Sequence, residues 1–208
     1  MKKLFLSSVA CLTLDKVIPI LPDKPNKLNL AFVPTASNPY NDKSWLYKDR
    51  AKLVEMGFKV KDVDIEGKTE EELRKELSNI DVLYVSGGNT FYLLEKAIAS
   101  GFDKLAKELI NKGIVYIGSS AGSVLLCPTI GFVEGMDDPK IAPSLKSYDG
   151  LNEVDFLVMP HYGDEDYKEV YKEILEQWKD KGYELKLLSN NEALIVEGNE
   201  LRIVEVPQ

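Results

Sequence analysis

Short apolar runs alternate with longer amphipathic stretches along the chain, and this alternation restricts the folds open to it. The strand-like runs lie at 3–9, 28–34, 59–64, 81–86, 113–117, 156–160, 184–188, 193–197 and 200–205. The helix-like stretches lie at 43–56, 70–77, 90–99, 102–112 and 166–181. Continuous apolar strands separated by helices form a mostly parallel sheet through right-handed crossovers, with helices covering both faces. The sequence therefore predicts an α/β, doubly wound fold.

The two ends of the chain complete this prediction. The last two runs are joined by a Gly-Asn pair, a turn signal that predicts a C-terminal β-hairpin. The first apolar run is too short for a leader peptide and is broken by two serines, so we expect it to be the first strand. No linker or repeat divides the 208 residues, and we expect one domain over 1–208.

Composition excludes several classes of function. The chain has 34 acidic and 26 basic residues and a net charge of −8, which disfavours binding to nucleic acid or to anionic membranes. No run approaches the ~20 apolar residues of a membrane helix. The two cysteines, Cys11 and Cys127, form no CxxC pair, which fits a reducing compartment, and we expect a cytoplasmic protein. The single histidine excludes a multi-histidine metal site, and we expect no cofactor.

The strongest local motif is Gly118-Ser-Ser-Ala-Gly122, which follows the run 113–117 and precedes a short apolar stretch. In a strand–turn–helix setting, a G-x-S-x-G sequence forms a nucleophile elbow, and its small residues allow a strained, tightly packed turn. Ser120 would then lie at a helix N-terminus, where developing negative charge is stabilised. A plain glycine and serine turn is the alternative for this motif taken alone.

Two further segments follow strand-like runs. Gly87-Gly88-Asn89-Thr90 closes the run 81–86, where its glycines could bring a backbone N–H near a ligand and Asn89 or Thr90 could cap a helix. His161 directly follows the run 156–160. Ligands of open α/β sheets bind at the carboxyl ends of strands, so we expect these segments and Ser120 to share one site. The irregular stretch 129–153 is long enough to suggest a functional or mobile loop, and it could act as a lid.

These segments together resemble the peptidase E family of aspartyl dipeptidases and their cyanophycinase relatives. The matching sequences are Val85-Ser-Gly-Gly-Asn-Thr-Phe-Tyr-Leu-Leu94, Gly118-Ser-Ser-Ala-Gly122 with Pro128-Thr-Ile130, and Met159-Pro-His-Tyr162. Their order and spacing fit along nearly the whole chain. The resemblance implies a fold similar to the class I glutamine-amidotransferase domain, with serine in place of cysteine at the elbow.

The resemblance also implies a serine peptidase acting on small peptides, as a dipeptidase or exopeptidase. Ser120 would be the nucleophile and His161 its base, with the backbone N–H groups of Gly88 and Ala121 as the oxyanion hole. It implies Glu192 as the acid that orients the histidine. Three acidic residues of the irregular stretch remain competitors for that role: Glu134, Asp137 and Asp138.

Substrate choice departs from the aspartate specificity of the best-known members. That specificity requires a cation, yet the segment after His161 is acidic and the chain's three arginines lie far from the motifs. We expect Asn89 and Asp164 to contact substrate. Asp164, Glu165 or Asp166 could hold a substrate amine, or the three could simply complement the dipole of the following helix.

Other functions remain possible on the same residues. An α/β-hydrolase esterase also has an elbow, but its histidine lies near the chain end, whereas strand-like runs follow His161 here. The same residues would also be compatible with cyanophycinase-like activity or with a binding module without catalysis. The sequence leaves the oligomeric state open between a monomer and a small homo-oligomer.

Overall fold

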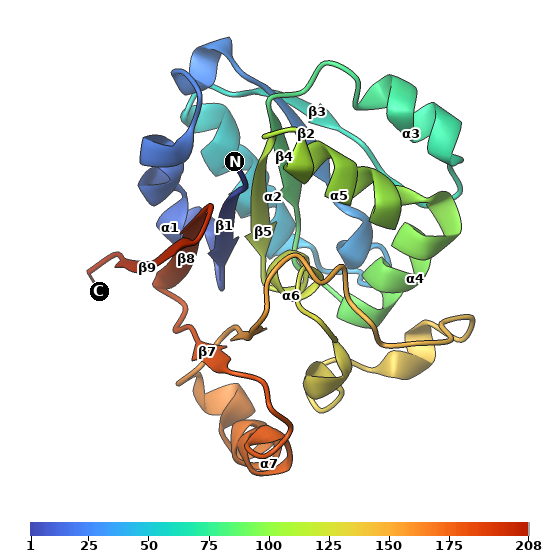
Figure 1. Cartoon of the computed structure of the whole chain (residues 1–208), viewed down its shortest axis with the longest axis vertical. Coiled ribbons are helices and arrows are strands. Elements are labelled where there is room, and N and C mark those ends of the chain that lie inside the picture. Colours follow the sequence, from blue (N-terminus) through green and yellow to red (C-terminus); the bar gives the residue numbers. More distant parts are fainter. Residues whose placement is uncertain (208) are drawn as a thin grey trace.

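The computed structural model describes residues 1–207 and has a seven-stranded sheet at its centre (Figure 1). The strands of this sheet are β1 (Lys3–Ser7), β2 (Asn29–Val33), β3 (Lys59–Asp62), β4 (Val82–Val85), β5 (Val115–Ser119), β8 (Glu192–Glu197) and β9 (Glu200–Glu205). Their order is β3-β2-β4-β5-β1-β8-β9. The first five pair in parallel, and β8 and β9 add as an antiparallel hairpin beside β1. Both the mostly parallel sheet and the C-terminal hairpin are thus confirmed.

The runs 156–160 and 184–188 form strands outside this sheet. They give β6 (Leu157–Met159) and β7 (Leu185–Leu187), which pair with each other in parallel as a separate small sheet. The small sheet is joined to the segment after the elbow, because the Val158 N–H donates to Cys127 Sγ at 3.2 Å. Figure 1 shows β7 and the helix α7 (Lys168–Trp178) beyond one end of the central sheet.

Helices cover both faces of the central sheet, as predicted. They are α1 (Ala10–Thr13), α2 (Ser44–Glu55), α3 (Glu70–Glu76), α4 (Thr90–Ser100), α5 (Phe102–Asn111) and α6 (Ala121–Val124). Short 3-10 helices are η1 (Leu14–Ile20), η2 (Pro25–Lys27), η3 (Thr35–Ser37), η4 (Gly131–Val133), η5 (Pro139–Ile141) and η6 (Glu165–Tyr167). Because side chains alternate along a strand, Leu4 and Leu6 of β1 join the core beneath α3, α4 and α5, while Phe5 joins the core beneath α1 and α2.

The segment after β1 differs from the sequence-based expectation. The run 3–9 was expected to be strand throughout, but the strand ends at Ser7 and the chain turns into α1 and η1. This turn leaves Ser8 and Val9 at the carboxyl end of β1, on the rim where β4 and β5 also end. Within residues 1–207, no helix combines the length and the apolar character needed to cross a membrane.

Candidate active site

Ser120 occupies a strained turn between β5 and α6. Its backbone angles are φ 46° and ψ −108°, a conformation that L-residues rarely adopt. The flanking glycines are required by close backbone packing: a Cβ on Gly122 would lie 2.1 Å from the Val85 carbonyl oxygen, and one on Gly118 would lie 2.7 Å from the Gly122 carbonyl. The turn therefore has the strained strand–turn–helix geometry of a nucleophile elbow.

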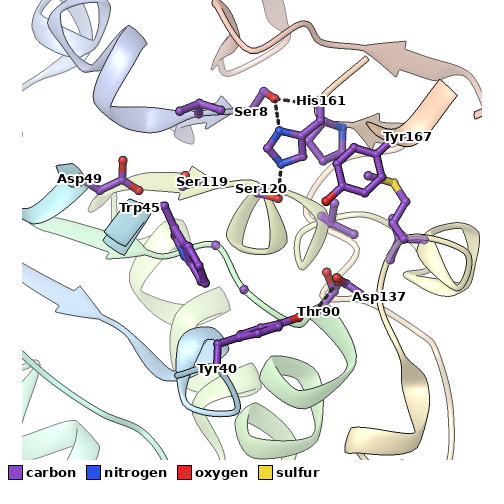
Figure 2. Close-up of a pocket in the computed structure, with 17 residues that line it drawn as sticks. Ser8, Tyr40, Trp45, Asp49, Thr90, Ser119, Ser120, Asp137, His161 and Tyr167 are labelled. Atoms are coloured by element: carbon purple, nitrogen blue, oxygen red, sulfur yellow. Dashed lines mark hydrogen bonds between the residues drawn. The ribbon is translucent and has the colours of Figure 1, made fainter. Parts of the chain in front are cut away.

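His161 faces this serine from the end of β6. The Ser120 Oγ lies 2.9 Å from His161 Nε2, and Figure 2 shows the two side chains directed toward each other. His161 also has a positive φ of 62°, and its backbone N–H donates to Ser8 Oγ at 2.7 Å. The structure thus brings together the two side chains that the sequence singles out, with a geometry suited to proton transfer.

The other imidazole nitrogen contacts an asparagine. His161 Nδ1 lies 2.8 Å from Asn190 Oδ1, in the turn that precedes β8. Glu192, expected at this position, instead accepts the Ser189 N–H at 2.7 Å and so closes that turn, which leaves Asn190 facing the ring. Among residues 1–207 no carboxylate hydrogen-bonds the imidazole, so the expected contact between Glu192 and His161 is wrong.

Two backbone N–H groups are free beside the serine. Within the part of the chain that the structure describes, the amides of Gly88 and Ala121 donate to no other protein group. Gly88 has φ 143°, and a Cβ there would lie 2.1 Å from the Ala36 carbonyl oxygen, so only glycine fits. These amides are available to an oxyanion that forms on a carbon bonded to Ser120.

The two residues expected to bind substrate have structural partners instead. Asn89 is buried and caps α4: its Oδ1 accepts the Tyr92 N–H at 2.8 Å, and its Nδ2 donates to the Asp138 carbonyl at 3.1 Å. Asp164 accepts the Asp166 N–H and the Asn190 Nδ2–H, both at 3.2 Å, and does not line the pocket described below. The structure thus gives both side chains structural roles, and substrate contact by either one stays a prediction.

Removal of the Asn89 cap should lower stability. We expect Asn89→Ala to reduce the free energy of unfolding by about 1 kcal/mol or more, because the first turn of α4 loses its side-chain acceptor. Urea unfolding followed by circular dichroism would measure this. Asn41→Ala is the matched control, since Asn41 is exposed. Equal stability of the two variants would contradict the capping role.

A pocket of about 400 Å³ opens in front of Ser120. Aromatic side chains of Tyr40, Trp45 and Tyr167 surround it, as Figure 2 shows. Its only charged groups among the described lining residues are the carboxyls of Asp49 and Asp137, and no lysine or arginine is among them. The pocket is therefore suited to a ligand with a cationic group rather than to one with a carboxylate.

The two pocket carboxyls differ in their partners. Asp49 is held by the Tyr84 hydroxyl and by the Cys11 N–H, and burial raises its pKa. Asp137 accepts the Thr90 N–H at 2.8 Å through Oδ2, at the start of α4. Burial raises the pKa of the Asp137 carboxyl, against the opposite effects of the Thr90 hydrogen bonds and of the nearby His161.

The other two candidate carboxyls, Glu134 and Asp138, do not contact His161. Asp138 accepts the Lys140 N–H at 2.9 Å at the start of η5, and Glu134 lies exposed beyond η4. The stretch 129–153 nevertheless contributes to the site, because Val133, Met136 and Asp137 line the pocket.

Comparisons of sequence and of structure with known proteins point to the same family. The model of peptidase family S51 matches residues 8–204. An uncharacterized peptidase of Listeria monocytogenes is 35% identical over 97% of each chain, and one of Pasteurella multocida is 33% identical over 98% of this chain and 97% of the relative. A peptidase E of Nostoc is 31% identical over 64% of this chain and 52% of its own length. A crystal structure from Listeria monocytogenes named as a peptidase E protein superposes with a TM-score of 0.93 at 33% identity, covering both chains fully.

Proposed function

The chain belongs to peptidase family S51 and is thus a peptidase, and we propose that it is a serine peptidase that removes the N-terminal residue of small peptides. The observation that supports this most directly is the 2.9 Å contact between Ser120 Oγ and His161 Nε2 at a strained elbow. Labelling by a fluorophosphonate, located by mass spectrometry, tests it. Modification at Ser120 is the expected result, and a protein that hydrolyses peptides without being labelled there would contradict the proposal.

The proposed mechanism follows from the contact between His161 Nε2 and Ser120 Oγ. Nε2 takes the proton of the Ser120 hydroxyl as Oγ bonds to the scissile carbonyl carbon, and the carbonyl oxygen becomes an oxyanion near the Gly88 and Ala121 amides. The protonated imidazole then gives its proton to the leaving amine as the C–N bond breaks. Water attacks the resulting ester, its proton passes to Nε2, and Ser120 and a carboxylic acid are released.

Asp137 supports an exopeptidase rather than an endopeptidase. In an N-terminal residue, the ammonium group is two bonds from the scissile carbonyl carbon, so it must lie in the same pocket as Ser120. Asp137 lines that pocket, where its Oδ2 accepts the Thr90 N–H at 2.8 Å. A carboxylate and an ammonium group form a strong charge-assisted hydrogen bond, so the proposed substrates carry a free N-terminal amine.

The same charges disfavour an aspartate side chain in the pocket. Binding its carboxylate would require a cationic partner, and the lining residues among 1–207 offer two carboxyls and no lysine or arginine. We therefore propose that the first residue of the substrate is neutral or basic. Dipeptides that vary only in this residue would test the point, and strict cleavage after aspartate would contradict it.

Replacing Asp137 by asparagine should remove the preference for a free amine. We expect kcat/KM for a free dipeptide to fall about 10- to 100-fold, because a charge-assisted hydrogen bond is lost. Both proteins should cleave an N-acetylated substrate poorly, and the substitution should lower kcat/KM for this substrate much less than for the free dipeptide. Paired assays with the two substrates would measure this, and Asp138→Asn is the matched control because that side chain caps η5.

The pH dependence gives a second readout of the same interaction. Because burial raises the pKa of Asp137, its carboxylate form is lost at a higher pH than that of an ordinary aspartate as the solution is acidified. KM for the free dipeptide should therefore rise as pH falls through this range in the wild type but not in Asp137→Asn. Equal losses for free and acetylated substrates would assign Asp137 a structural role only.

A further inference from the structure

A chain of hydrogen bonds extends from His161 to Asp164. His161 Nδ1 lies 2.8 Å from Asn190 Oδ1, and the Nδ2 of the same amide lies 3.2 Å from Asp164 Oδ2. We propose that Asp164 is a positioning residue that acts through Asn190 to fix the tautomer of His161, so that Nε2 is the free base facing Ser120. This inference rests on the proposed function for its kinetic consequence, but the tautomer itself can be measured without activity.

The direction of the Asn190 amide follows from the chemistry of its neighbour. An ionised carboxylate only accepts hydrogen bonds, whereas an amide has an oxygen that accepts and an NH₂ group that donates. Asp164 Oδ2 therefore favours the orientation in which the NH₂ group faces it and the amide oxygen faces His161. Without this acceptor, a rotation of the amide would exchange the two ends at little cost.

Ser8 supports the same orientation from the other side. Its Oγ accepts the His161 backbone N–H at 2.7 Å and lies 3.3 Å from both Asn190 Oδ1 and His161 Nδ1. When Nδ1 carries the imidazole proton, the Ser8 hydroxyl can donate only to the amide oxygen. The amide oxygen then accepts from both Ser8 and the imidazole, which matches its two lone pairs. A reversed amide would place its NH₂ group against the ring and would require Nδ1 to be the acceptor.

The tautomer decides whether the histidine can act as a base. With the amide oxygen at Nδ1, the neutral ring carries its proton on Nδ1 and leaves a lone pair on Nε2 for the Ser120 proton. With the amide reversed, the proton would be on Nε2, and the ring could not accept from Ser120. A neutral residue can thus take the orienting place that a carboxylate holds in other serine hydrolases.

Asp164 also has a structural role, which the test must distinguish from its proposed positioning of His161. Its Oδ1 accepts the Asp166 N–H and caps η6, while its own N–H donates to the His161 carbonyl at 3.1 Å. Asp164→Asn is the informative variant because asparagine is also a good cap. It keeps an oxygen for the cap but presents an NH₂ group to the NH₂ group of Asn190. Glu165→Gln is the charge-matched control, since Glu165 is exposed and pairs with Lys168.

The single histidine makes the tautomer directly observable. Nitrogen-15 NMR of histidine-labelled protein reports one imidazole only, because the chain contains one histidine. At alkaline pH we expect the wild type and Glu165→Gln to carry the proton on Nδ1. Asp164→Asn should shift the ring toward the form protonated on Nε2. The Nε2-protonated form in the wild type, or an unchanged tautomer in Asp164→Asn, would overturn the inference even if Ser120 is still labelled by a fluorophosphonate.

Kinetics and a rescue variant complete the test. Asp164→Asn should lower kcat about 10- to 100-fold with little change in KM, because substrate contacts are untouched. Adding Asn190→Asp to Asp164→Asn should restore most of kcat, because the introduced carboxylate accepts from both Nδ1 and the new amide. In an Asn190→Ala background, Asp164→Asn should have no further effect. A full additional loss in that background, or no rescue, would show that Asp164 acts independently of Asn190.

Discussion

Replacement of Ser120 by alanine is expected to lower kcat/KM by about 10⁶-fold, because the proposed acyl intermediate forms on the hydroxyl that contacts His161 Nε2. His161→Ala should cause a loss of the same order, since Nε2 is the only base within hydrogen-bond distance of Ser120 Oγ in the described chain. The double variant should be no worse than either single one, because the two residues act as one unit. Steady-state hydrolysis of a free dipeptide, corrected for contaminating peptidases, would measure these losses.

The preceding serine provides a matched control. Ser119 is the neighbouring residue and is buried, but its Oγ accepts the Ala10 N–H at 3.4 Å and does not contact His161. Ser119→Ala should therefore keep most of the activity and all of the fluorophosphonate labelling. Activity of Ser120→Ala at a tenth of the wild-type level or more, in a protein with an unchanged circular dichroism spectrum, would exclude the acyl-enzyme mechanism.

The second large effect is expected at the oxyanion site. Gly88→Ala should lower kcat about 10²- to 10³-fold, since the added Cβ would meet the Ala36 carbonyl and displace the N–H that we propose as an oxyanion donor. The loss should appear in kcat more than in KM, because the oxyanion exists only in the transition state and the intermediate. Single-turnover measurements with an ester substrate would separate this step from binding.

A second glycine distinguishes local displacement from general strain. Gly113 also has a positive φ, 91°, but a Cβ there would meet no atom within 4 Å, and the residue lies at the opposite end of β5 from Ser120. Gly113→Ala should lower thermal stability through backbone strain while preserving kcat. If Gly88→Ala retained full kcat, the Gly88 amide would not be part of the oxyanion hole.

Local sequence signals identified most of the elements and the central pair of residues. The strand-like runs predicted every strand to within a few residues. The signal is continuous for the inner strands of the central sheet, such as β4 and β5, because both of their faces are buried. The elbow and His161 were found because both follow such runs. The segment 10–20 was not predicted to be helical, since its helices are short and depend on packing against the sheet.

The partners of polar side chains could not be read from the sequence in the same way. Glu192 and Asn190 are two positions apart, and both precede or begin the same strand, so which one reaches His161 depends on the turn that Glu192 closes with Ser189. Asn89 follows a glycine pair typical of ligand sites, yet its side chain caps α4. Asp137 enters the pocket from a stretch with little regular structure, which periodicity does not describe.

The proposed nucleophile and its proposed base follow strands of different sheets. Ser120 comes directly after β5 of the seven-stranded sheet, whereas His161 lies two residues beyond β6 of the two-stranded one. Turnover therefore depends on the alignment of two separately paired units as well as on the integrity of each. A disturbance that loosens the smaller unit would part the imidazole from the hydroxyl while the larger unit stays folded. Loss of catalysis during heating should accordingly precede loss of the central sheet's ellipticity.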